Sequence, residues 1–186
     1  MAADLRLLVS RALAAVTLLM ATVCATAGKP HEHGVVRLDV SVDGSLLRLD
    51  LSAPLDNWLG FERSPRNDAE RKAAADVLTR LRNPTQTPPL FSADAAAQCR
   101  LVKAEVSAPA LEGAGGATAK HASDEHADLE ASFEFACAQP AQLRTLDVGL
   151  FDAYRRIQLI RVQLATAKAQ AKVTLKRPAR SVSLTP

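Results

Sequence analysis

Aromatic residues and glycine are scarce in this chain, and each shortage excludes a class of function. Of its 186 residues only 4% are aromatic and only 8 are glycine, which leaves little material for base-stacking surfaces or glycine-rich phosphate loops. An excess of charge of one sign is lacking too, because 23 Lys and Arg residues stand against 20 Asp and Glu residues. We therefore expect no nucleic-acid partner, since such binding depends on neutralising phosphates.

Sequence motifs of common enzyme classes are absent as well. The chain contains no Gly-x-Ser-x-Gly and no His-Glu-x-x-His, the patterns that mark serine hydrolases and zinc proteases. Glu32 lies between two histidines, but nothing in the sequence positions it as a general base. We therefore expect a protein that is not an enzyme. The 48% of hydrophobic residues is enough to build a sizeable core in one domain.

The amino terminus has the pattern of a secretory signal. Arg6 and Arg11 precede an uncharged run of 12 residues, 12–23, which is too short to span a bilayer. The small-x-small sequence of residues 25–27 then provides a cleavage site. We expect residues 1–27 to be a cleaved signal peptide.

The mature protein is then a single periplasmic domain of residues 28–186, with no stable insertion into a membrane. An uncleaved amino-terminal anchor is one alternative to this interpretation. A lipoprotein modified at Cys24 is another, but Val23 is bulky where lipoprotein signals carry a small residue.

Two cysteines, Cys99 and Cys137, remain after signal cleavage. Because an exported chain enters an oxidising compartment, we expect them to form a disulfide. In the chain-entropy account, a disulfide that closes the loop between these two cysteines stabilises the folded state by about 4 kcal/mol. A reduced thiolate pair that binds metal is the alternative, although neither cysteine lies in a Cys-x-x-Cys motif.

Alternation of hydrophobic and polar residues predicts several β-strands. Residues 35–53 read as a hairpin around Asp43-Gly44. Val102, Ala104 and Val106 are expected to share one face of a later strand. The expected strands after the hairpin are 99–106, 129–137, 145–151, 157–165 and 171–176, with a short edge strand at Val182 and Leu184.

One segment has helical rather than strand periodicity. Asn67 and Glu70 have the spacing of a capping box, and hydrophobic residues then recur at helical intervals as far as Asn83-Pro84. This predicts one amphipathic helix over residues 67–82. The expected fold is α+β, a mainly antiparallel β-sheet with one amphipathic helix and a disulfide-tied His/Asp loop at about residues 107–127, with the bridge at the root of that loop.

All four histidines fall in two short polar clusters, which makes metal binding the chemistry to consider. Imidazole and carboxylate groups are ligands that Zn²⁺ prefers. The alternative is that these are merely exposed polar side chains. An amino-terminal copper or nickel chelate is not expected, because Pro30 has no amide proton to lose. The candidate zinc ligands are His31, His33, His121 and His126, with Asp124, Glu125 and Asp128 beside them.

The order of these features resembles the ZrgA-like family of small periplasmic zinc-uptake proteins. The resemblance rests on the opening His31-Glu32-His33-Gly34, the segment 54–62 that runs from Pro54 to Gly60-Phe61-Glu62, the two cysteines around the His/Asp loop, and Leu150-Phe151. It implies a protein that binds zinc in the periplasm and assists its import beside an envelope zinc-import transporter. Two differences stand out: the loop holds only two histidines, and Arg63 occupies a position where the family often carries His. Arg63 stays protonated and cannot ligate zinc.

Two functions remain open at this point. In the first, the histidines bind zinc and the neighbouring carboxylates complete the shell or orient the imidazole rings. In the second, the histidines are incidental and the protein is a structural or partner-binding envelope domain that uses residues 54–62 around Trp58. A single tryptophan in a chain with few aromatics is expected in the core rather than on the surface.

Overall fold

The computed structural model describes residues 32–112 and 127–185. All of these residues lie in one compact unit, His31–Pro186. Within those two ranges no helix is both long and apolar enough to cross a membrane. The expected signal peptide, residues 1–27, lies outside the described residues.

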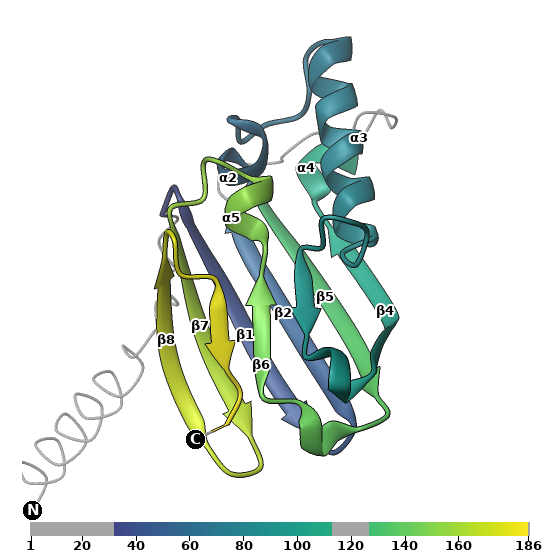
Figure 1. Cartoon of the computed structure of the whole chain (residues 1–186). Coiled ribbons are helices and arrows are strands. Elements are labelled where there is room, and N and C mark those ends of the chain that lie inside the picture. Colours follow the sequence, from purple (N-terminus) through teal and green to yellow (C-terminus); the bar gives the residue numbers. More distant parts are fainter. Residues whose placement is uncertain (1–31, 113–126, 186) are drawn as a thin grey trace, which may run out of the picture. The chain divides into compact units, whose positions relative to one another are not determined.

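A six-stranded sheet forms the main body of the fold (Figure 1). Its strand order is β4-β5-β2-β1-β7-β8, and every neighbouring pair is antiparallel except β1 and β7, which run parallel. The expected hairpin is confirmed, with Asp43 opposite Leu46 at its turn. The strands are β1 (Val35–Asp43), β2 (Leu46–Pro54), β4 (Cys99–Ser107), β5 (Asp128–Cys137), β7 (Leu159–Thr166) and β8 (Gln170–Lys176).

A smaller sheet covers one face of the large one and closes the core. It consists of β3 (Phe91–Ala93), β6 (Thr145–Val148) and β9 (Ser181–Ser183) in the order β3-β6-β9. The rings of Phe91 and Phe133 lie 5.1 Å apart between the two sheets. Because only one face of the large sheet is covered, its strands alternate between buried hydrophobic and exposed polar side chains, which is the pattern visible in the sequence.

The amphipathic helix is α3 (Asp68–Arg82). The Asn67 side chain accepts a hydrogen bond from the Glu70 N–H at 2.9 Å, and the Glu70 carboxylate accepts one from the Arg66 N–H at 2.7 Å. Together these bonds satisfy amide groups that the helix start leaves open. The presence of this helix beside the two sheets confirms the expected α+β fold class. The remaining helical elements are short: α2 (Asp56–Leu59), α4 (Pro109–Glu112), α5 (Leu150–Ala153) and the 3₁₀ turns η1 (Ala95–Ala97) and η3 (Pro140–Gln142).

Three local expectations are wrong. The register of β4 shifts between Leu101 and Lys103, so Val102 is 59% exposed instead of sharing the inward face of Ala104. The strand expected over residues 145–151 ends at Val148, and α5 follows Gly149. The segment expected to be loop from residue 107 instead forms α4 over Pro109–Glu112, with Ala108 and Leu111 buried in the core.

The Cys99–Cys137 disulfide is confirmed, but its position differs from the expected one. The two cysteines are direct partners across β4 and β5, with Cα atoms 3.8 Å apart. Cys99 begins β4 and Cys137 ends β5, whereas the loop leaves from the other ends of these strands. The bridge therefore closes the hairpin far from the loop, because antiparallel pairing puts the start of one strand beside the end of the next.

Candidate functional site

One end of the large sheet gathers the described parts of both histidine clusters. β1 begins there, two residues after His33, and β2 ends there. Asp128, the first residue of β5, lies opposite Pro54, and the Leu55 N–H donates to the Ala127 carbonyl at 2.8 Å. In Figure 1 the short helices α2 and α4 lie at this end of the sheet. β1 and β5 therefore begin at the same end of the sheet, on either side of β2.

A buried asparagine fixes the entry to β1. Asn57, on α2, is 1% exposed. Its Oδ1 accepts from the Gly34 N–H at 2.6 Å, and its Nδ2 donates to the Val35 carbonyl at 2.7 Å. Both hydrogen-bonding ends of this amide are therefore used to hold the backbone next to His33 against α2.

His33 faces a carboxylate from the segment that follows α2. Its Nε2 lies 3.0 Å from Oε1 of Glu62, and the two side chains are 62% and 32% exposed. Gly60 ends α2 with a φ of +82°, a conformation that favours glycine. A Cβ at that position would also come within 2.6 Å of the Arg156 guanidinium. This turn directs Phe61 and Glu62 away from the helix.

The carboxylate next to His33 in sequence is engaged elsewhere. Glu32 makes a two-point ion pair with the Arg161 guanidinium, at 2.7 and 3.0 Å. On the described surface, therefore, the carboxylate that faces His33 belongs to Glu62 rather than to Glu32.

Arg63 has a structural role. Its guanidinium binds both oxygens of Glu70, at 2.7 and 3.0 Å, and lies over the Phe61 ring. The Arg63 hydrogen bonds, with the backbone N–H of Arg66, lower the pKa of Glu70 to about 2. Arg63 therefore ties the segment after Glu62 to the start of α3.

The expected ligands divide into two groups. His33 and Asp128 are described and lie at the same end of the sheet, Asp128 being half-buried. Across residues 32–112 and 127–185, no three His, Cys, Asp or Glu side chains form a group able to hold a metal ion. The other five expected ligands, His31, His121, Asp124, Glu125 and His126, lie outside the described residues.

Sequence reasoning missed Glu62 and Asn57. Glu62 stands in the Gly60-Phe61-Glu62 motif, which carries part of the family resemblance, so the motif itself was the available signal. Asn57 lies in the same segment, residues 54–62, but nothing in the sequence shows that its side chain is buried or which backbone groups it binds.

Trp58 is buried, at 7% exposure, as expected for a core residue. Its ring packs edge-on against Tyr154 with the centroids 4.7 Å apart, and burial raises the pKa of the Tyr154 hydroxyl to about 12. The alternative in which an exposed Trp58 meets a partner protein is therefore wrong.

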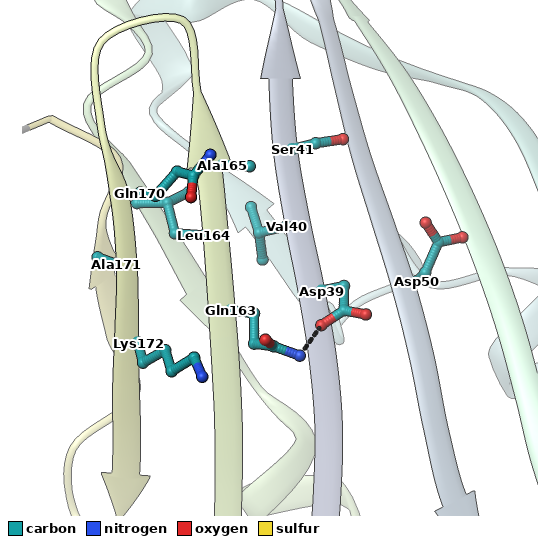
Figure 2. A pocket seen from close by; sticks show the side chains of 10 residues that line it. All are labelled: Asp39, Val40, Ser41, Asp50, Gln163, Leu164, Ala165, Gln170, Ala171 and Lys172. Carbon is teal, nitrogen blue, oxygen red and sulfur yellow. Dashed lines mark hydrogen bonds between the residues drawn. The ribbon is translucent and has the colours of Figure 1, made fainter. Parts of the chain in front are cut away.

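A separate shallow hollow lies on the uncovered face of the large sheet (Figure 2). Within it, Gln163 donates to Asp39 at 3.0 Å. The carboxylate of Asp50 is held by the guanidinium of Arg48 at 2.8 and 3.1 Å. Neither histidine nor cysteine lines the hollow. Since its polar groups already bind one another, it is a poorer zinc site than the end of the sheet.

Two comparisons with known proteins bear on this arrangement. A family model described as "ZrgA family zinc uptake protein" matches residues 30–184. A search of curated proteins finds no match to the chain. The matched range includes His31, His33 and Glu62 together with all nine strands of the described fold.

Proposed function

Because the chain belongs to the ZrgA family of zinc uptake proteins, we propose that it binds zinc in the periplasm and assists zinc import without catalysing a reaction. His31, His33, His121 and His126 supply imidazole ligands. Asp124, Glu125 and Asp128 complete the shell or accept hydrogen bonds from the imidazole N–H groups. The zinc ion is cargo, which the protein passes to an envelope zinc-import transporter.

The position of His33 and Asp128 at the same end of the large sheet carries this proposal. The two histidine clusters are far apart in sequence, so they can share one ion only if the fold brings their flanking residues together. β1 and β5 both pair with β2 and both begin at the same end of the sheet. Two strand spacings of about 4.8 Å each separate β1 from β5, so the segments that lead into them start about 10 Å apart. Histidine and carboxylate side chains that reach toward each other from the two segments can meet around one ion.

The cysteine pair and the amino terminus support the proposed location. A disulfide persists in an oxidising compartment such as the periplasm, and Cys99 and Cys137 are bonded. The pattern of residues 1–27 is that of a signal peptide. We therefore propose that residues 28–186 are the exported form.

Calorimetric titration of oxidised residues 28–186 with zinc tests the proposal. We expect saturable binding that is lost when His31, His33, His121 and His126 are all replaced by alanine. Binding should also weaken as the pH falls through about 6.5, because an imidazole must be neutral to ligate a metal. Parallel titrations with copper and nickel measure the preference among ions. Zinc affinity equal to the parent's in the fourfold variant would refute the proposal.

A further inference from the structure

We infer that Glu62 is a zinc ligand and that the ion binds between its carboxylate and Nε2 of His33. This inference rests on the proposed function and adds a ligand to it. It starts from the contact between His33 and Glu62, a residue that lies in neither cluster of candidate ligands. Glu62 lies 29 positions after His33 in the chain, yet its Oε1 is 3.0 Å from the imidazole Nε2.

The separation of these two atoms suits a shared metal ion. Zinc lies about 2.0–2.1 Å from a histidine nitrogen and about 2.0–2.2 Å from a carboxylate oxygen. Two such donors at a tetrahedral angle are about 3.3 Å apart. The pair therefore needs to open by only a few tenths of an ångström for an ion to replace the hydrogen bond, and water can fill the remaining positions of the shell.

Both donors are accessible and neither is committed to another group. The His33 and Glu62 side chains are 62% and 32% exposed, so an ion can reach them from solvent. Among the described residues, the ion-pair partner of Glu62 is His33. The nearest arginine in sequence, Arg63, is held by Glu70 and does not compete for the Glu62 carboxylate.

The two segments are held in place before any ion arrives. Asn57 bonds both Gly34 and Val35, so the backbone that carries His33 is fixed to α2. Five residues after Asn57, the same stretch of chain presents Glu62, after the turn at Gly60. Asn57 is thus a positioning residue, and a preorganised pair of donors loses less conformational freedom when it binds an ion.

Substitution of the two neighbouring glutamates tests the inference on oxidised residues 28–186. Glu62→Gln preserves the shape of the side chain and removes its charge, and Glu62→Ala removes the donor. Glu32→Gln is the matched control, because Glu32 is adjacent to His33 in sequence but is bound to Arg161. We expect both Glu62 variants to lose zinc affinity by about tenfold or more, and Glu32→Gln to stay within about twofold of the parent.

Ring-nitrogen NMR of His33 distinguishes a ligand from a residue that only orients the imidazole. If Glu62 and His33 share the ion, zinc replaces the proton on Nε2. If Glu62 only orients the ring, Nε2 keeps its proton toward the carboxylate and zinc binds Nδ1 instead. Metal on Nδ1 would overturn the inference. Thermal melts of the metal-free variants check that each one is folded.

The outcomes also separate this inference from the proposed function. A parent protein that takes up no zinc overturns both. Zinc binding that needs the histidines but survives both Glu62 substitutions overturns the inference alone. Loss in the Glu62 variants, retention in Glu32→Gln and metal on Nε2 together establish it.

Discussion

Replacing Asn57 by alanine is the sharpest test of how the site is held. The substitution leaves the Gly34 N–H and the Val35 carbonyl without their partner, and both residues are buried. An unsatisfied buried polar group costs about 1–3 kcal/mol. With one donor and one acceptor affected, we expect Asn57→Ala to lower the free energy of unfolding by about 2–6 kcal/mol. That is a large part of the about 5–15 kcal/mol typical of a domain.

Urea denaturation followed by the fluorescence of Trp58 measures this effect. Trp58 is the single tryptophan of the chain, it is buried, and it follows Asn57 directly on α2. Asn83→Ala is the matched control, because the exposed Asn83 donates one hydrogen bond, to the Thr79 carbonyl. It should cost about 1 kcal/mol or less. If Asn57→Ala lowers the free energy of unfolding no more than Asn83→Ala does, the two Asn57 hydrogen bonds do not hold the entry to β1. In the folded variant, zinc affinity should also fall, by about tenfold.

Three further predictions concern the body of the fold. The pKa of Glu70 is lowered to about 2, so its ionised form stabilises the folded state above the ordinary carboxyl pKa, and this stabilisation is lost as the pH falls toward 2. Melting temperatures of parent and Glu70→Gln should therefore differ at pH 7 and converge between pH 5 and pH 2.5; an unchanged difference would contradict the Arg63 contact. Replacing Cys99 and Cys137 with serine should cost about 2–5 kcal/mol in urea denaturation, and a loss below 1 kcal/mol would show that the bridge matters little. Val102→Thr should change stability by less than about 0.5 kcal/mol, whereas Leu101→Ala should cost about 1–2 kcal/mol; the reverse order would rule out the bulge in β4.

Most strands and the helix could be predicted from the sequence because their signals are local. The alternation in residues 35–53 reports one buried face of a sheet, and Asn67 with Glu70 marks a helix start by its spacing. The disulfide was predictable for a different reason, since the two cysteines that remain after the expected signal peptide is set aside leave one pairing. Its place at the far end of the hairpin required the strand register, which only the fold supplies.

The bulge and the His33–Glu62 contact could not be predicted in the same way. A pattern of strictly alternating hydrophobic and polar residues does not reveal a single inserted residue, so the sequence predicted the wrong face for Val102. Glu62 meets His33 only because Asn57, α2 and the turn at Gly60 bring two distant segments together. Such contacts depend on tertiary geometry, to which neither composition nor spacing is sensitive.

The disulfide position has a chemical consequence for metal handling. Cys99 and Cys137 lie at one end of β4 and β5, and Ser107 and Asp128 lie at the other. At about 3.4 Å per residue, a nine-residue strand separates the sulfurs from the histidine end by about 27 Å. Thiolates are strong zinc ligands, and a reductant would create two of them. At that distance the two sulfurs cannot join the proposed histidine site as further ligands of the same ion, so reduction of the disulfide would not enlarge the shell of that site.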